Sequence, residues 1–334
     1  MSMTKVLLVG ATGETGGSIA NGLLEAGTFE VYALIRPRSA AKPALTALQE
    51  RGVKVRQCDM TASEDELLGA LKDIDVVIST VGPSDQLEQI PLAKAAKKAG
   101  VKRFVPCGFI PVTPAGGVMW LRDQKEIVYN HIKQLWLPYT IIDVGWWYQF
   151  AYPRLSSGKI DYAMTMSNDE IIGDGNTPSA LTDLRDIGHY VAKIVSDERT
   201  LNKMVFAYDT VLTQNEIYDM LEKISGEKIE RKHVSEEEVL ERVTSARASS
   251  ETYPYDPAKY VPRYIAEYQL SWGIRGDNKP EYAKYLGYLT SKELYPDFKP
   301  SNFEEYLKHV FSGTAKGIYT DRIKRFDSKY PPSA

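Results

Sequence analysis

The sequence predicts an α/β fold in which a doubly wound parallel sheet is followed by a smaller, irregular α+β lobe. Through the first half of the chain, apolar segments of strand length alternate with helical patterns. Such alternation is typical of parallel strands joined by right-handed crossovers. Beyond residue 150 the pattern becomes irregular and rich in polar and aromatic residues. We therefore expect one domain over residues 1–150 and a second lobe over residues 151–330.

The first strand, over residues 4–9, runs into Gly10, Gly13 and Gly16, and a helical pattern begins there. In a strand–turn–helix unit the first glycine permits the tight turn and the second lets backbone N–H groups approach a pyrophosphate. The third lets the helix pack closely on the strand. This context favours a Rossmann-type dinucleotide site over a plain connector. The candidate cofactor-binding residues of the loop are Gly10, Ala11, Thr12, Gly13, Glu14, Thr15 and Gly16.

The second strand, over residues 30–35, ends at Arg36. A carboxylate at this place binds the ribose 2′-hydroxyl of NAD, whereas an arginine suits a 2′-phosphate. Arg38 and Lys42 follow on the same loop and could add further cations. The alternative is a solvated basic loop. We therefore expect NADPH/NADP rather than NADH as the cofactor.

Four further strands are predicted over residues 53–59, 75–82, 103–107 and 139–144, with helices at 64–71, 90–99 and about 121–135. Ligands of such sheets lie past the carboxyl ends of the strands. This rule selects the loops at Gly10, Arg36, Asp59, Gly82, Gly108 and Gly145. The further candidate cofactor-binding residues at these ends are Asp59, Thr80, Val81, Gly82, Cys107, Gly108 and Phe109.

Composition narrows the class of protein. The net charge of −3 gives no electrostatic case for nucleic acid or anionic membranes. Two cysteines suit a reducing compartment, and no signal peptide or membrane-length apolar run is evident. The four histidines have no metal-ligand spacing, so we expect no metal. We expect a soluble cytoplasmic protein, either a monomer or a homodimer, whose partner is a small molecule.

Beyond residue 150 three helical segments stand out. A helix over about residues 183–196 could pack back on the sheet. Thr213 and Glu216 form a capping box at the start of a helix that ends near residue 224. An aromatic stripe repeats every four residues at Tyr260, Tyr264, Tyr268 and Trp272. Core packing is the favoured interpretation of the stripe, and a substrate-pocket wall or a dimer surface is the alternative.

Two lysines on the helix before the sixth strand are candidates for proton transfer. Tyr129 and Lys133 match Y-x-x-x-K, in which a lysine lowers the pKa of a catalytic tyrosine. However, the ligand end of the sheet meets the N-terminal end of this helix, where Lys125 lies. Tyr129 lies about 6 Å and Lys133 about 12 Å further along the helix. Lys125 is therefore the better acid/base candidate, although a solvated helix charge is the alternative and Tyr129 could assist.

The sequence resembles the NmrA-like branch of the atypical short-chain dehydrogenases/reductases, especially fungal isoflavone-reductase-like proteins related to pinoresinol–lariciresinol reductases. The segments that carry the resemblance are Gly10–Gly16, Ile78–Gly82, Lys102–Pro106, Lys125 and Leu137–Ile142. The match is good over about the first 150 residues and looser beyond. The resemblance implies that NADPH delivers hydride to a conjugated aromatic substrate, and that Lys125 is the general acid/base.

One departure from the plant reductases concerns the loop after the fifth strand. The plant proteins carry Pro-Ser-Glu-Phe-Gly, whereas this chain has Pro-Cys-Gly-Phe-Ile over residues 106–110. The resemblance places Phe109 near the nicotinamide, but the floor of the pocket differs. A bulky aromatic rim follows the sixth strand, and the candidate substrate-pocket residues are Phe109, Gly145, Trp146, Trp147 and Tyr148.

These observations predict an NADPH-dependent reductase. Its expected substrate is a conjugated aromatic molecule such as an enone, a quinone or a quinone-methide-like compound, in secondary or phenolic metabolism. The alternative is a non-catalytic NmrA-like regulator that senses NAD(P). Regulators of that class tend to lack the catalytic lysine, so Lys125 favours the enzyme. A reductase of simple quinones is a third possibility.

Overall fold

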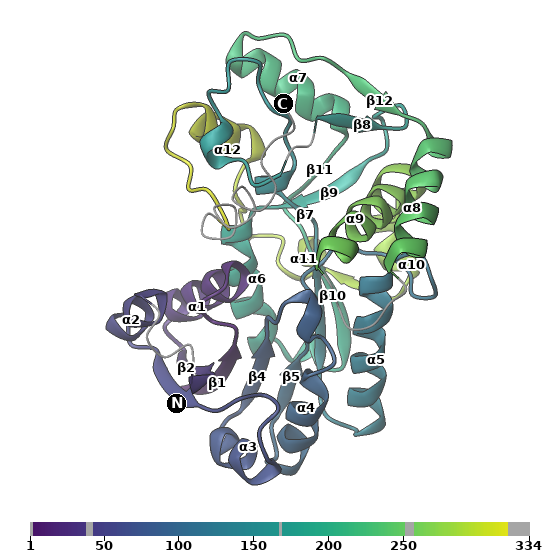
Figure 1. Cartoon of the computed structure of the whole chain (residues 1–334). Coiled ribbons are helices and arrows are strands. Elements are labelled where there is room, and N and C mark those ends of the chain that lie inside the picture. The colour runs from purple at the N-terminus through teal and green to yellow at the C-terminus, as the bar shows by residue number, and fades with distance from the viewer. Residues whose placement is uncertain (1–2, 38–42, 167–168, 251–256, 320–334) are drawn as a thin grey trace.

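A computed structural model describes residues 3–37, 43–166, 169–250 and 257–319 of the chain, and a parallel sheet lies at its centre (Figure 1). The first strands are β1 (Thr4–Val9), β2 (Phe29–Ile35), β3 (Lys54–Gln57), β4 (Val76–Ser79) and β5 (Arg103–Val105). They pair in the order β3-β2-β1-β4-β5, all in parallel. The Phe104 N–H donates to the Pro138 carbonyl at 2.8 Å, and thereby extends the sheet past β5. The strands that continue it in parallel are β6 (Thr140–Val144), β10 (Lys203–Ala207) and β13 (Leu289–Thr290).

Helices cover both faces of the sheet. One face carries α1 (Glu14–Ala26), α2 (Pro43–Glu50) and α6 (Leu184–Ser196), and the other carries α3 (Glu64–Leu71), α4 (Gln89–Lys98) and α5 (Trp120–Gln134). Because side chains of a strand alternate between its two faces, Val6 and Leu8 join the first of these cores and Leu7 and Val9 join the second. The predicted doubly wound, Rossmann-type fold is confirmed.

Helix α6 packs directly against α1, backbone to backbone. A Cβ atom added to Gly22 would lie 2.2 Å from the Gly188 carbonyl carbon, so neither helix tolerates a side chain at the crossing. The Ser18 hydroxyl donates to the Leu184 carbonyl at 2.6 Å and accepts from the Gly188 N–H at 3.0 Å. The helix expected near residues 183–196 therefore lies on the first half of the chain.

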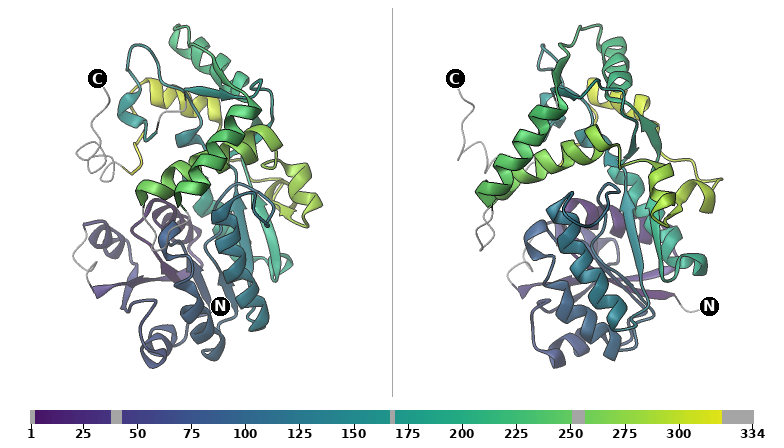
Figure 2. Two further views of the ribbon diagram at one scale, coloured as in Figure 1. Left: turned by 45° about the vertical axis from the view of Figure 1, so that its right-hand side comes forward. Right: turned by 90° about the vertical axis from the view of Figure 1, so that its right-hand side faces the viewer.

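The remaining elements form a second lobe at one end of the parallel sheet (Figure 2). Its strands are β7 (Trp146–Trp147), β8 (Glu170–Ile172), β9 (Ser179–Thr182), β11 (Thr210–Leu212) and β12 (Lys232–Val234). They form a mixed sheet β11-β9-β7 and a pair β12-β8. The helices of this lobe are α7 (Gln214–Ser225), α8 (Glu236–Ser250), α9 (Pro257–Tyr268) and α12 (Phe303–Phe311). Two short helices, α10 (Pro280–Tyr285) and α11 (Ser291–Leu294), pack beside β10 and β13 of the parallel sheet. A π-helical segment, Gln269–Arg275, directly continues α9.

The division of the chain near residue 150 stays a prediction, because α6, β10 and β13 return to the parallel sheet from the second half. Among the described residues, no helix combines the length and apolar character needed to cross a bilayer. In the same part of the chain, no cluster of three histidine, cysteine or acidic side chains could hold a metal ion.

Candidate active site

The glycine loop after β1 has the shape of a dinucleotide cradle. Gly10 has a φ of 81°, and a Cβ atom there would lie 2.6 Å from the Thr80 carbonyl oxygen. Thr80 in turn donates through Oγ1 to the Val9 carbonyl at 2.7 Å. A Cβ atom on Gly16 would lie 2.1 Å from the Gly10 carbonyl oxygen. The first and third glycines are therefore required by close packing.

The middle of the loop is open for an anion. Ala11 is buried, whereas Gly13 is exposed and begins α1 without a side-chain cap. The first N–H groups of a helix have no intrahelical partner, so those of α1 can bind phosphate oxygens. Thr12 lies half-buried beside them, and the Glu14 carboxylate accepts a hydrogen bond from the Tyr319 N–H at 2.8 Å. The loop thus fits a pyrophosphate.

The loops after β2 and β3 contain the residues predicted to bind the 2′-phosphate end of the cofactor, and two of these residues already have partners within the protein. Arg36 donates to Asp85 at 2.8 Å, and this hydrogen bond raises the pKa of Arg36. Asp59 accepts from the N–H and hydroxyl groups of Thr61. Arg38 and Lys42 lie outside the described residues. The roles of these residues toward a 2′-phosphate stay predictions.

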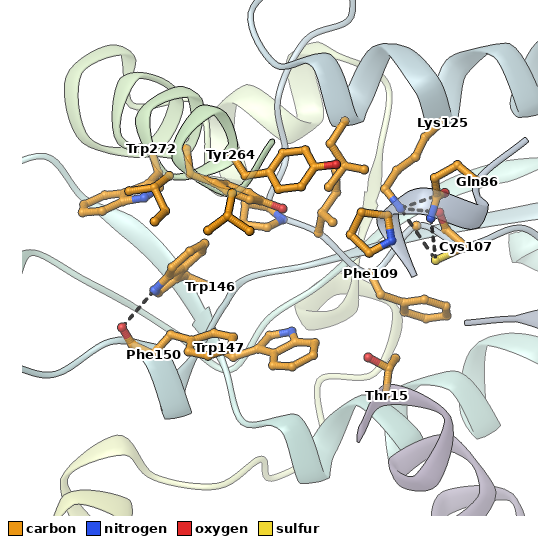
Figure 3. A pocket seen from close by; sticks show the side chains of 18 of the residues that line it. Thr15, Gln86, Cys107, Phe109, Lys125, Trp146, Trp147, Phe150, Tyr264 and Trp272 are labelled. Carbon is orange, nitrogen blue, oxygen red and sulfur yellow. Dashed lines mark hydrogen bonds between the residues drawn. The ribbon is translucent and has the colours of Figure 1, made fainter. Parts of the chain in front are cut away.

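A cavity of about 360 Å³ opens between the strand ends and the second lobe (Figure 3). Of the predicted residues, those that line it are Thr15, Thr80, Val81, Cys107, Gly108, Phe109, Lys125, Trp146 and Trp147. Gly82 lies beside it in the turn after β4, where its carbonyl accepts from Gln86 Nε2 at 2.9 Å. The loops after β1, β4, β5 and β6 therefore converge as the rule of carboxyl strand ends requires.

Lys125 lies at the inner end of this cavity and is only 2% exposed. Its Nζ donates to the Cys107 carbonyl at 2.8 Å and to Gln86 Oε1 at 3.2 Å, and it lies 3.6 Å from Cys107 Sγ (Figure 3). Within the described residues no carboxylate forms an ion pair with it. Burial lowers the pKa of Lys125, since the charged form loses its hydration. Lys125 is therefore no solvated helix charge. Its role in proton transfer stays a prediction.

The alternative pair on α5 does not reach the cavity. Tyr129 is buried in the core on the α5 side of the sheet, and burial raises the pKa of its hydroxyl. Lys133 lies one turn further along and is exposed. The geometric argument for Lys125 over Y-x-x-x-K agrees with these positions.

Aromatic rings form two walls of the cavity. Trp147 stacks on Phe150 with ring centroids 5.5 Å apart, and Tyr319 from the far end of the described chain stacks on both at 6.4 Å. Tyr268 and Trp272 lie on the facing wall, and Trp146 contacts their rings at 5.1 Å and 6.2 Å. Trp146 also contacts the Phe150 ring at 5.9 Å, so it joins the two walls. A slot between flat rings suits a planar, apolar ligand.

Two predicted pocket residues do not line the cavity. Tyr148 is fully buried in the core of the second lobe, where its ring contacts Phe303 and its hydroxyl donates to the Ser301 carbonyl. Gly145 packs against the Ala180 backbone, 2.7 Å from where its Cβ would be. The aromatic rim is thus shorter than predicted, because the chain turns into the lobe after Trp147.

Many residues of the cavity lining are not among the site residues predicted from the sequence. The additional lining residues are Pro83, Gln86, Ile110, Pro111, Leu121, Phe150, Met166, Val261, Tyr264, Ile265, Tyr268, Gln269, Trp272 and Tyr319. The aromatic stripe was the available signal: Tyr264, Tyr268 and Trp272 line the cavity, whereas Tyr260 packs on Trp120 at 4.7 Å. The pocket-wall alternative therefore describes most of the stripe.

Comparison with known proteins identifies the family. The model of the NmrA-like family matches residues 2–307. The chain belongs to the NmrA-like family. It is 46% identical to asnovolin J 5′,6′-dehydrogenase of Aspergillus novofumigatus (strain IBT 16806) over 312 residues, which cover 92% of this chain and 95% of that protein. Phenylcoumaran benzylic ether reductase TP7 of Nicotiana tabacum is 29% identical over 322 residues, with coverages of 92% and 98%.

Solved structures of reductases are similar to this chain over nearly its whole length. The complex of leucoanthocyanidin reductase with NADPH from Vitis vinifera is 26% identical, with a TM-score of 0.77 over 92% of this chain and 99% of that one. A structure titled as AtPrR2 with NADP⁺ and (+)pinoresinol is 25% identical, with a TM-score of 0.73 over 93% and 99%. The resemblance inferred from the sequence is confirmed, and it extends through the second lobe.

Proposed function

We propose that this protein is an NADPH-dependent reductase that delivers hydride to a conjugated aromatic small molecule, with Lys125 as its general acid/base. The substrate would be an enone, a quinone or a quinone-methide-like compound of secondary or phenolic metabolism. The observation that carries the proposal is the position of the buried Lys125 amine, at the inner end of an aromatic cavity beside the strand ends. The proposal also includes a cytoplasmic location and a monomeric or homodimeric state.

The protein is an oxidoreductase with NADPH/NADP as its cofactor, in keeping with its named relatives and the NADPH complex of its structural neighbour. The N–H groups along the first turn of α1, which follows Gly13, would hold the pyrophosphate. Arg36 would bind the 2′-phosphate after exchanging its contact with Asp85. When bound, NADPH supplies the hydride, and the protein supplies position and electrostatics.

Lys125 would donate a proton to the substrate and take one up again. A protonated amine has three donors, and the Cys107 carbonyl and Gln86 Oε1 accept two of them. Among the described residues the third donor has only the weak acceptor Cys107 Sγ within reach, so it is available to an oxygen atom of a ligand. A lowered pKa brings the amine closer to the pH of the reaction, where donating and regaining a proton are both efficient.

The aromatic walls of the cavity would favour a planar, apolar ligand. Trp147, Phe150 and Tyr319 stack on one side, Tyr268 and Trp272 lie on the other, and Trp146 joins the two. These rings exclude water from a planar substrate and strengthen the electrostatic contacts of Lys125. Gln269 also lines the cavity and could bind a polar group of the ligand.

The experiment is NADPH consumption, followed by absorbance, with a panel of quinones, enones and phenolic alkenes. Wild type, Lys125→Met and the matched control Lys133→Met are compared, because Lys133 lies on the same helix but is exposed. We expect Lys125→Met to lose about 100-fold or more in turnover with NADPH binding intact, and Lys133→Met to retain it. Tight NADPH binding by wild type without turnover of any compound would instead favour the sensor.

A further inference from the structure

A fully buried ionic cluster lies one helical turn from Lys125. Arg122 and Asp143 are both 0% exposed, and Arg122 Nη2 donates to Asp143 Oδ2 at 2.5 Å. The hydroxyl of Tyr288, from the loop before β13, donates to the same oxygen at 2.5 Å. The cluster therefore joins α5, β6 and the chain segment that leads into β13.

The pairing inside this cluster is incomplete. Arg122 Nε and Nη1 and Asp143 Oδ1 have no hydrogen-bond partner among the described residues, and neither does the Tyr129 hydroxyl. The carboxylate of Glu126 approaches Arg122 Nη1 only to 3.8 Å. A buried ion pair needs good geometry and saturated hydrogen bonds to repay its desolvation. A contribution to the stability of the fold therefore does not explain why this buried ion pair is present.

The cluster and Lys125 share a backbone segment. Arg122 precedes Lys125 by three residues, so both lie on the same face of α5. Asp143 lies under Gly108, where an added Cβ atom would be 3.1 Å from Asp143 Oδ1 and 2.3 Å from the Ile142 carbonyl oxygen. Gly108 directly follows Cys107, whose carbonyl accepts from Lys125. The absence of a side chain at position 108 is what lets a carboxylate sit beside the proton-transfer site.

We propose that Arg122 and Asp143 are positioning residues that set the charge state of the Lys125 amine. This inference rests on the role of Lys125 in the proposed function. The permanent charge of Arg122 repels a proton on Lys125, and the charge of Asp143 attracts one. The two charges of the pair therefore act in opposite directions on the protonation of Lys125.

Several groups around Lys125 act on its pKa, and Arg122 and Asp143 act on it in opposite directions. Burial lowers the pKa of Lys125, Cys107 raises it, Arg122 lowers it and Asp143 raises it. Gln86 is neutral, and burial raises the pKa of Tyr268 in the facing wall, so neither adds a charge near neutral pH. Burial likewise raises the pKa values of Tyr288 and Glu126 beside the pair.

The opposing signs give a test that a merely structural role would fail. Asp143→Asn keeps the shape and the acceptor for Tyr288 but removes the negative charge, so the Lys125 titration should move to lower pH. Arg122→Met removes the positive charge, so the titration should move to higher pH. The double variant Arg122→Met with Asp143→Asn has no buried charge left unpaired, and should titrate between the single variants. If one single variant folds poorly, the other is compared with the double variant, because removal of the second charge should move the Lys125 titration back toward that of wild type.

The readout is the side-chain nitrogen resonance of Lys125 in lysine-labelled full-length protein with NADP⁺ bound, assigned by its loss in Lys125→Met. Arg103→Met is the matched control, since Arg103 is also buried but at the start of β5, bonded to Thr200 and the Ile194 carbonyl. We expect opposite shifts for the single variants and none for the control. Shifts in one direction, or no shift in either variant, would overturn the proposal.

Turnover gives a second, separable readout. If wild type turns over a substrate, the inflection in the pH profile of kcat should follow the same two directions, whereas KM should change little. If no substrate is turned over, the proposed function fails, but the resonance titration still decides the inference. The two failures are therefore distinguishable.

Discussion

The glycine cradle makes a sharp prediction because two adjacent glycines of α1 have different surroundings. In Gly16→Ala the new methyl carbon would lie 2.1 Å from the Gly10 carbonyl oxygen and 2.8 Å from Thr80 Oγ1. In Gly17→Ala the nearest atom, the Ala11 carbonyl oxygen, is 3.8 Å away, which is an ordinary contact. The first substitution should therefore damage the cofactor site, and the second should not.

The expected loss of stability and of NADPH affinity in Gly16→Ala follows from how far the backbone must move. Nonbonded carbon and oxygen atoms lie roughly 3 Å apart or more, so the turn or helix must retreat by about 1 Å in Gly16→Ala. Because the obstacle is backbone, it cannot rotate away. Overpacking of this kind costs about 1–3 kcal/mol of stability. Withdrawing one N–H group from a phosphate oxygen costs about 1.5–3 kcal/mol, which is roughly 10- to 150-fold in NADPH affinity.

The assay is a fluorescence titration with NADPH together with a thermal melt. Gly16→Ala should bind NADPH at least about tenfold more weakly. Gly17→Ala should bind like wild type and gain about 0.5–1 kcal/mol of stability, because alanine suits a helix interior better than glycine. The reasoning is refuted if Gly16→Ala binds NADPH like wild type, or if both variants lose the same affinity.

Two further predictions concern charge. Arg36→Met should weaken NADPH by about tenfold or more while leaving NADH unchanged, because the lost contact is to the 2′-phosphate; equal weakening of both in direct titrations would contradict this. Partial burial opposes the protonation of His189, but hydrogen bonds to Glu25 and Asp186 outweigh it and raise its pKa above 6.5. Its stabilisation is thus complete below that unfolded value and is lost as pH rises through the higher folded value. The melting temperature of His189→Gln should fall furthest below wild type near about pH 6 and converge with it near about pH 8, and a constant difference would contradict the assignment.

Local patterns were enough to predict the parallel sheet and the position of Lys125. The glycine spacing marks the turn after β1, and the end of α5 that faces the site follows from strand direction alone. The contact of Arg36 with Asp85 could not be predicted, because the two residues are 49 positions apart and meet only when β2 and β4 flank β1. Strand β10 also gave no clear signal in a segment with irregular patterning.

The aromatic residues show where side-chain direction matters more than residue type. Trp146 and Trp147 line the cavity, but the next residue, Tyr148, begins a short 3-10 turn into the core. Conversely, the spacing of the aromatic stripe favours core packing, yet most of the stripe lines the cavity. A four-residue repeat drifts around an α-helix of 3.6 residues per turn, and the wider π-helical turn after Tyr268 offsets this drift. Tyr264 and Trp272 therefore stay on the cavity face.

The contact of α1 with α6 has a consequence for how the chain is made. The partners of Ser18 lie 166 and 170 residues further along, so the helix of the cofactor cradle emerges from the ribosome long before its packing surface. At a synthesis rate of about 5–20 residues per second, that interval is on the order of ten to thirty seconds. During this interval the face of α1 around Gly22 lacks the helix α6 that packs against it in the folded protein. A fragment that stops near residue 150 lacks α6, and it would leave that face of α1 uncovered for good.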